Sequence, residues 1–193
     1  MGSFPTAYLL LKWKSRLDIR ETGSGNVGTL NAMEVSRSTA ISAVVLVADL
    51  LKGSLAAALP MLIWGPQSGL MAAAGVAVIV GHNYPIWMRF KGGRGLAPTA
   101  GVLFVTGPFF VAAWMILWAI GYLLSKNIHI GNVAACIAAP ILLAAVPEAM
   151  LNPLLPRFVD HEIFLYLIIA LCSLILIRHS GPIADLIRAR RSS

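Results

Sequence analysis

The sequence predicts an all-α fold, that of a polytopic helical integral membrane protein with about six to seven transmembrane helices. Of its 193 residues, 58% are hydrophobic, and the mean hydropathy is +0.80. Charged residues make up 12% of the chain and lie in the gaps between apolar runs. That pattern is expected because an ion at mid-bilayer costs several kcal/mol. The length suits one unit, so we expect residues 1–193 to form a single membrane-embedded domain.

The net charge of +7 favours a protein whose loops face anionic lipid and anionic substrates. The basic residues are not gathered in one soluble, aromatic-rich segment, so we expect no nucleic-acid partner. The two cysteines, Cys136 and Cys172, both fall within apolar runs. We interpret them as small hydrophobic residues that form no disulfide.

The chain starts with an apolar stretch, residues 4–11, that is too short to cross a bilayer. Crossing about 30 Å of hydrocarbon takes roughly 20 helical residues. A signal peptide is not favoured, because no basic segment precedes the stretch and no small-residue cleavage site follows it. We therefore expect residues 4–11 to be the last turns of a truncated first helix.

The longest polar stretch, residues 12–37, contains the sequence GSGNVGTLN at residues 23–31. One interpretation is a solvated turn before a helix, with Asn31 as the cap. The other is a backbone nest for an anion, since three glycines alternate there with Ser24 and Asn26. It is not a Walker loop, because no Gly-Lys-Ser/Thr follows it. The pattern alone leaves both interpretations open.

The first clear span is residues 40–59, and it carries Asp49 and Lys52 on one helix face. They are either a structural pair that neutralises itself or groups that reach a polar site, and an ionisable residue inside a span favours the second reading. We expect an uncharged loop at residues 60–68 and a further span at residues 69–80.

The central loop, GHNYPIWMRFKGGRG at residues 81–95, is the most informative stretch. Its glycines let backbone N–H groups approach a ligand, and its cations supply charge, so it is a candidate anion cradle. If Gly95 leads into a helix, the first amides of that helix would face the same anion. His82 is either a general base or a hydrogen-bonding residue at a helix end, and both readings stay open.

Residues 96–124 carry no charge, but Gly107-Pro108 interrupts them. Further spans are expected at residues 129–146 and 163–177. The positive-inside rule places the polar stretch, the central loop and the arginine-rich tail on the cytoplasmic side only if residues 96–124 count as two crossings. We therefore expect six crossings after the N-terminal remnant, with halves of about 14 residues that span about 21 Å.

The order of three motifs resembles the bacterial acyl-phosphate:glycerol-3-phosphate acyltransferase family. These motifs are GSGNVGTLN, DLLKG at residues 49–53 and GHNYPIWMRFKGGRG, and the similarity covers about residues 2–103. The resemblance implies a multi-pass enzyme of the bacterial inner membrane, with its glycine-rich loops and C-terminus cytoplasmic. It implies acyl transfer from acyl phosphate to the 1-hydroxyl of glycerol 3-phosphate, giving lysophosphatidic acid and phosphate in phospholipid synthesis. Membrane lipid surrounds such a protein, and no cofactor or metal is expected.

The resemblance and the residue patterns together give the expected site. The expected catalytic residues are Ser24, Asn26, Arg37, Lys52 and His82. The expected phosphate-binding residues are Gly23, Gly25, Gly28, Asn31, Lys91, Gly92, Gly93, Arg94 and Gly95. Further candidates are Asp49, Asn83 and His179.

The chain departs from the family pattern at several positions. Glu34 stands where an arginine is usual, with Arg37 one turn later, and Arg94 replaces a usual lysine. In the C-terminal motif His179 remains, but Pro182 occupies the asparagine position and no glutamate follows. These departures predict a divergent member. The alternative is a non-catalytic membrane protein that binds phosphate esters or lipid head groups. A transporter is less favoured, because neither glycine-rich loop has a second copy.

Overall fold

The computed structural model describes residues 1–191, and all regular elements within this range are helical. Ser192 and Ser193, the end of the expected domain, lie outside the described residues. The all-α prediction is therefore confirmed for the described chain. In chain order the elements are α1 (Thr6–Ser15), α2 (Thr29–Ser36), α3 (Thr39–Trp64), α4 (Ser68–Asn83), the 3-10 turn η1 (Ile86–Met88), α5 (Leu96–Thr106), α6 (Pro108–Ser125), α7 (Ile128–Ala145), α8 (Glu148–Leu151), η2 (Asn152–Leu154) and α9 (His161–Arg191).

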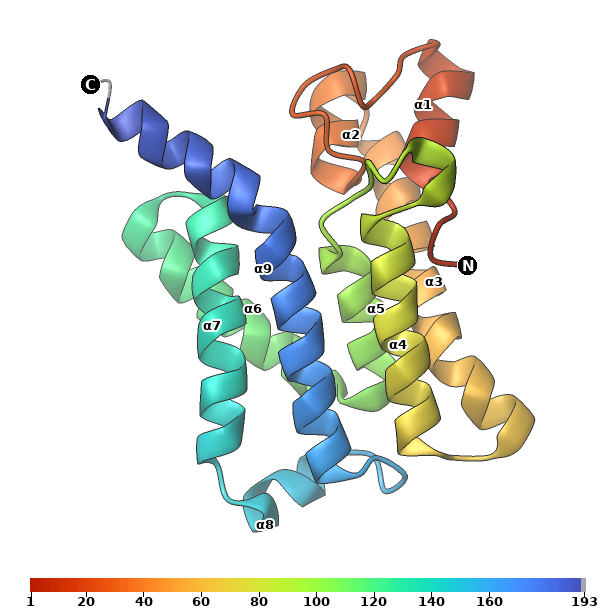
Figure 1. Cartoon of the computed structure of the whole chain (residues 1–193), viewed down its shortest axis with the longest axis vertical. Coiled ribbons are helices and arrows are strands. Elements are labelled where there is room, and N and C mark those ends of the chain that lie inside the picture. Colours follow the sequence, from red (N-terminus) through yellow and green to blue (C-terminus); the bar gives the residue numbers. More distant parts are fainter. Residues whose placement is uncertain (192–193) are drawn as a thin grey trace.

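The long helices form an elongated bundle with the short elements at its two ends (Figure 1). Five of the described helices, α3, α4, α6, α7 and α9, are long and apolar enough to cross a membrane. Helix α5 is apolar but has only 11 residues, and it packs inside the bundle between its longer neighbours. Helices α1 and α2 cover one end, and α8 lies at the opposite end. This arrangement is that of a multi-pass membrane protein.

The outer surface of the bundle is apolar, as a lipid-facing surface must be. Helix α6 is the clearest case, since only 6% of its residues are buried inside the protein. Its exposed side chains include Met115, Ile116, Ile120, Leu123 and Leu124. A soluble protein would rarely expose so continuous an apolar face. We therefore place α6 against lipid.

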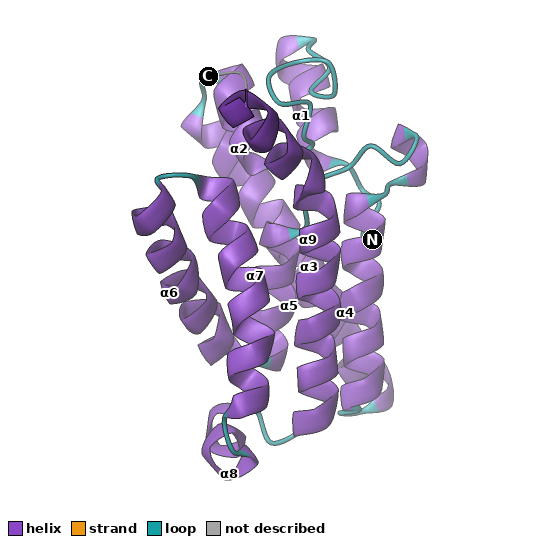
Figure 2. Ribbon diagram, turned by 60° about the vertical axis from the view of Figure 1, so that its left-hand side comes forward, coloured by secondary structure: helices purple, strands orange, loops and turns teal. Residues whose placement is uncertain are grey.

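Two separate apolar cores hold the chain. The larger core joins α4, α5, α7 and α9 through residues such as Ile79, Val102, Cys136 and Phe164. The smaller core packs α1 and the loop after it against α2 and the start of α3, through Leu11, Ile19, Val27, Ala32 and Val45. The smaller core fixes residues 23–31 over the end of the bundle, where Figure 2 shows the longest loops.

The expected loop at residues 60–68 is wrong, because α3 continues through Pro60 to Trp64. Proline removes one helical hydrogen bond, but its fixed φ is close to the helical value. Neighbouring helices and local adjustments let membrane helices keep such prolines, and α7 and α9 likewise continue through Pro140 and Pro182. Helix α9 therefore runs well beyond residue 177, where the sequence predicted the span to end.

The predicted break at Gly107-Pro108 is confirmed, although the two parts are unequal. Helix α5 has 11 residues and α6 has 18, and Gly107 ends the first and begins the second. Pro108 takes the first position of α6, where the missing N–H costs nothing. A side chain at Gly107 would overlap the Phe164 ring, which explains the glycine at this turn.

Candidate functional site

The first glycine-rich loop is held in shape by one asparagine side chain. Oδ1 of Asn31 accepts a hydrogen bond from the Ser24 amide at 3.0 Å. Its Nδ2 lies within hydrogen-bonding distance of the backbone oxygens of Ile19, Thr22 and Asn26, at 3.1, 3.1 and 3.0 Å. Asn31 is 1% exposed. Its expected place as a helix cap is wrong, because α2 begins two residues earlier with Gly28 at the N-cap. Asn31 therefore organises the loop from inside the first turn of α2.

The central loop is held by an arginine from the far end of the chain. Nε and Nη2 of Arg178, in α9, donate hydrogen bonds to the carbonyl oxygens of Gly93 and Gly92 at 3.0 and 2.9 Å. The same guanidinium lies 5.3 Å from the centre of the Tyr84 ring. A side chain at Gly93 would overlap the imidazole of His82. The Gly-Gly pair is therefore packed between α4 and α9.

The buried polar cluster at the centre of the site consists of Asp49, Lys52 and His82. Nζ of Lys52 lies 2.7 Å from Oδ1 of Asp49 and 2.7 Å from Nδ1 of His82. Oδ1 of Asp49 is 3.8 Å from the same imidazole nitrogen. All three side chains are buried. A charged amine donates, so Nδ1 of His82 accepts from Lys52, and the ring proton then sits on Nε2. This geometry favours a fixed hydrogen-bonding role for His82 over that of a general base.

A cavity of about 310 Å³ lies beside this cluster, where the first turns of several helices meet. The start of α2 contributes Gly28 and Thr29, and the start of α5 contributes Gly95 and Leu96. The start of α7 contributes Ile128 and His129. The remaining lining residues are Asn26, Leu30, Leu46, Asp49, Leu50, His82, Arg94, Ala97, Ala100 and Asn132.

The cavity is electropositive for two independent reasons. Each helix N-terminus carries about half a positive charge on amides that have no partner within the helix. In the described chain no side chain caps the N-terminus of α2 or of α5, whereas Asn127 caps α7. The Arg94 guanidinium adds a fixed cation. Burial lowers the pKa of Arg94, and nearby Arg178 lowers it further, but an arginine stays charged at neutral pH. This combination is suited to a phosphate group.

The prediction that Gly95 leads into a helix is confirmed. Gly95 is the N-cap of α5 and has φ 82°, in the left-handed region that side chains rarely adopt. Arg94 therefore directly precedes the first turn of α5, and both line the cavity. Pro98 stands in that first turn, where it lacks an N–H that would have no helical partner anyway.

Helix α7 brings two side chains to the cavity that the sequence analysis did not include, His129 and Asn132. Nδ2 of Asn132 lies 3.2 Å from Nε2 of His179, and Nδ1 of His179 lies 2.8 Å from the carbonyl oxygen of Ile175. The His129 and His179 rings lie edge to face at 5.8 Å. His179 was expected in the site, and it lies directly behind Asn132. Two polar residues three apart at the start of an apolar span were the signal that could have identified His129 and Asn132.

The expected residues divide into three groups. Those that line the cavity are Asn26, Gly28, Asp49, His82, Arg94 and Gly95. Those that support its walls are Asn31, Lys52, Gly92, Gly93, Asn83 and His179, and Asn83 donates to the carbonyl oxygen of Leu174 at 3.4 Å. Ser24, Arg37 and Lys91 are exposed and do not line the cavity, and Gly23 and Gly25 lie in the turn around Ser24.

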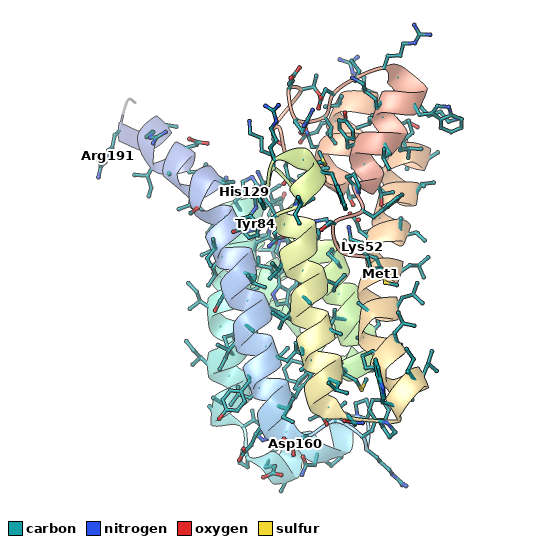
Figure 3. The ribbon with its side chains drawn as sticks, turned by 45° about the vertical axis from the view of Figure 1, so that its right-hand side comes forward. Met1, Lys52, Tyr84, His129, Asp160 and Arg191 are labelled. Atoms are coloured by element: carbon teal, nitrogen blue, oxygen red, sulfur yellow. The ribbon has the colours of Figure 1, made fainter. Side chains whose placement is uncertain are left out.

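Figure 3 places the polar part of the site at one end of the bundle. Lys52, Tyr84 and His129 lie toward the end that carries α1 and α2, whereas Asp160 lies at the opposite end. A second cavity, of about 120 Å³, lies next to the polar cavity, between α5, α6, α7 and α9. Leu96 and Ala100 line both cavities. The lining of the second cavity is almost wholly apolar, including Leu103, Phe110, Trp114, Ala139 and Leu171.

Comparisons with known proteins agree on one family. The sequence model of the family described as glycerol-3-phosphate acyltransferase matches residues 1–189. Glycerol-3-phosphate acyltransferase 2 of Thermotoga maritima is 32% identical over a match of 191 positions, which covers 97% of this chain and 88% of the relative. The protein of the same name from Moorella thermoacetica is 39% identical over 142 residues, or 74% and 72% of the two chains.

Two solved structures are similar over nearly the whole chain. One is PlsY (YgiH), an integral membrane glycerol 3-phosphate acyltransferase, in its glycerol 3-phosphate form. It is 28% identical with a TM-score of 0.79, and the match covers 98% of this chain and 88% of that one. The lysophosphatidic acid form of PlsY is 27% identical with a TM-score of 0.76, covering 98% and 87%.

Proposed function

The chain belongs to the glycerol-3-phosphate acyltransferase family, and on that premise we propose that it transfers a fatty acyl group from acyl phosphate to the 1-hydroxyl of glycerol 3-phosphate. The products are lysophosphatidic acid and inorganic phosphate. The relatives named for acyl transfer to glycerol 3-phosphate, and a solved neighbour in a glycerol 3-phosphate form, support this proposal. They do not favour the alternative of a non-catalytic binding protein.

The observation that carries the proposal is an electropositive cavity that lies next to an apolar one and shares two lining residues with it. Acyl phosphate has an anionic head and a long apolar tail, and the acceptor is a small anion. The cavity at the starts of α2 and α5 suits the anionic groups, and the apolar cavity beyond Leu96 and Ala100 suits the acyl chain. The scissile carbonyl would then lie near the boundary that these two residues form.

We assign the two phosphates to different helix starts. Arg94 and the first amides of α5 hold the phosphate of glycerol 3-phosphate. At this helix start the cation of the central loop and the free helix amides lie next to each other in the cavity wall. Asn26 and the first amides of α2 hold the phosphate of the donor. Ser24, Arg37 and Lys91 are exposed, and we propose that the two cations among them attract anionic substrates to the site.

The chemistry asks little of the protein beyond placement and charge stabilisation. The 1-hydroxyl oxygen attacks the carbonyl carbon, the C–O bond to phosphate breaks, and phosphate leaves with the bonding electrons. Acyl phosphate is a mixed anhydride with a good leaving group, so no enzyme nucleophile is required. The developing negative charge is stabilised by helix amides and Arg94. The hydroxyl proton passes to a phosphate oxygen of the substrates, and His82 serves as a fixed hydrogen-bonding group of the wall.

We further propose that the site faces the cytoplasm from the inner membrane of a bacterium. The positive-inside rule favours this orientation, because Lys12 and Lys14 in the last turn of α1, and Arg16 directly after it, lie at the end that carries the site. Lys126 lies in the connection between α6 and α7 at the same end, and Arg157 lies in the loops at the other end. The C-terminal part of α9 also extends from the site end.

The experiment that tests the proposal is acyl transfer by the purified protein in lipid. Labelled palmitoyl phosphate and glycerol 3-phosphate are supplied, and labelled lysophosphatidic acid and free phosphate are measured. Palmitoyl coenzyme A is supplied in a parallel reaction as the comparison donor, because it carries the same acyl chain without the acyl phosphate group. We expect equal amounts of both products from palmitoyl phosphate. A protein that unfolds cooperatively but forms neither product from palmitoyl phosphate would refute the proposal.

A further inference from the structure

We propose that helix α7 recognises the acceptor, with Asn132 and His129 contacting the hydroxyl of glycerol 3-phosphate that does not react. This inference rests on the proposed function and names the side chains that select its acceptor. Both residues line the polar cavity together with Arg94. The cavity therefore brings together a cationic side, formed by the starts of α2 and α5 with Arg94, and the uncharged hydrogen-bonding groups of α7.

The orientation of the Asn132 amide is fixed from behind. Nδ1 of His179 carries its proton toward the carbonyl oxygen of Ile175, so Nε2 of His179 is left as an acceptor. Nδ2 of Asn132 donates to that acceptor at 3.2 Å. Asn132 is 7% exposed, and it is a residue of the cavity wall. Its carbonyl oxygen and its second N–H are therefore the groups that remain for a ligand.

His129 adds a second hydrogen-bonding group from the previous turn of α7. Its Nδ1 is buried and has no hydrogen-bond partner within the described chain. Its backbone N–H is already taken, since Oδ1 of Asn127 accepts from it at 2.9 Å. A buried polar atom without a partner costs about 1–3 kcal/mol. His129 lines the polar cavity, so a turn of its ring that pairs this nitrogen with a ligand atom would stabilise the complex.

A hydroxyl group is the ligand that fits these two side chains. An amide and an imidazole each offer both donor and acceptor atoms, and a hydroxyl needs one of each. The anionic phosphates are better served by Arg94 and the helix starts, and the acyl chain by the apolar cavity. The part of the acceptor left over is its 2-hydroxyl. A site built to hydrogen-bond a hydroxyl rejects an analogue that lacks it, because its buried polar groups then stay unpaired.

The test compares glycerol 3-phosphate with propane-1,3-diol monophosphate, which keeps the phosphate and a primary hydroxyl but lacks the 2-hydroxyl. We expect the unmodified protein to prefer glycerol 3-phosphate about tenfold or more in kcat/KM. Asn132→Ala and His129→Gln should each reduce this preference, by lowering kcat/KM for glycerol 3-phosphate and not for the deoxy acceptor. The KM for acyl phosphate should stay unchanged. Asn152→Ala is the matched control, because Asn152 is exposed and donates a hydrogen bond to Glu148 of α8.

Direct binding of the two acceptors keeps the test independent of turnover. The dissociation constants of both acceptors are measured by calorimetry on the unmodified protein and on Asn132→Ser, a smaller polar replacement. A preference for glycerol 3-phosphate that Asn132→Ser loses supports the inference. Equal kcat/KM values and equal dissociation constants for the two acceptors, in an active protein, would overturn the inference but not the proposed acyl transfer. If the unmodified protein is inactive but binds glycerol 3-phosphate more tightly than the deoxy acceptor, and Asn132→Ser loses this preference, only the proposed reaction is overturned.

Discussion

Nζ of Lys52 lies 2.7 Å from Nδ1 of His82, so a cation in the middle of α3 holds the imidazole at the end of α4. The same amine pairs with Asp49, which lines the polar cavity together with His82. The DLLKG motif thus supports the wall behind the central loop. The pair is structural, because Lys52 neutralises Asp49, and it also reaches a polar site, because Asp49 lines the cavity and Lys52 orients the His82 side chain there.

Replacing Lys52 tests this arrangement. Lys52→Met leaves Asp49 buried without its cation, and breaking a buried pair costs about 3–5 kcal/mol. The double variant Asp49→Leu with Lys52→Met should recover most of that stability, since apolar groups can replace a buried pair. Neither variant should recover transfer activity, because His82 loses its donor. Denaturant unfolding in micelles measures the stability. A single variant as stable as the unmodified protein would rule out a buried charged pair.

Gly93→Ala tests the close packing of the central loop on α4. The new side chain would overlap Nε2 of His82, so the loop must shift and Arg94 must move with it. We expect a large loss of kcat/KM for glycerol 3-phosphate. Gly69→Ala is the matched control, because no atom lies within 4 Å of a side chain placed at that position of α4. The account fails here if both variants retain full activity.

Arg178 positions the central loop without lining the cavity. Arg178→Ala removes both hydrogen bonds to the carbonyl oxygens of Gly92 and Gly93, so we expect kcat/KM to fall about tenfold or more. Added guanidinium ion should partly restore the activity, a response that a general packing defect would not give. Arg188→Ala, at an exposed pair with Asp185, is the control. Failure of guanidinium to restore any activity, in a folded variant, would argue against the clamp.

Ala139→Phe tests the apolar cavity as the site of the acyl chain. Ala139 lies two turns beyond Asn132 on α7, about 10 Å further along the helix from the polar cavity, and it lines the apolar cavity. The larger ring should shorten the cavity, so transfer from palmitoyl phosphate falls while transfer from octanoyl phosphate persists. Ala43→Phe, on an exposed part of α3, is the control. An equal loss for both donors would place the chain elsewhere.

Stability at low pH should depend on the pair between Asp18 and Arg20. Hydrogen bonds from Arg20 lower the pKa of Asp18 from its ordinary value near 4 to about 2. A lowered folded-state pKa stabilises the fold above the unfolded value, and that stabilisation is lost as pH falls from about 4 to about 2. Thermal unfolding in micelles across that range should show a decline that Asp18→Asn removes. Identical pH profiles for the two proteins would contradict the assigned pKa.

The apolar pattern and the glycines predicted the architecture well. The break at Gly107 and the helix that follows Gly95 were both visible, because each depends on residues next to one another in the chain. The end of α3 was missed, since neighbouring helices decide whether a helix continues through Pro60. The local sequence pattern therefore predicted which helices form, whereas packing between helices decided where some of them end.

The site was predicted in part. Arg94 and Asn26 were expected and line the cavity, but Lys91 looked equivalent to Arg94 in sequence and is exposed. Only the fold separates these two cations, because Arg94 directly precedes Gly95 at the start of α5, where the cavity lies, whereas Lys91 lies three residues earlier in an exposed part of the loop. His129 and Asn132 were missed because they belong to no glycine-rich motif, and α7 reaches the site only through tertiary packing.

The most direct test of the central claim is the KM for glycerol 3-phosphate of Arg94→Gln beside Arg89→Gln. Both arginines belong to the central loop, but only Arg94 lines the cavity, and Arg89 is exposed. We predict that Arg94→Gln raises this KM about tenfold or more with a smaller change in kcat, because the cation binds the acceptor phosphate already in the ground state. Arg89→Gln should behave as the unmodified protein. An unchanged KM in Arg94→Gln, or an equal rise in both variants, would contradict the assignment of this cavity to the acceptor phosphate.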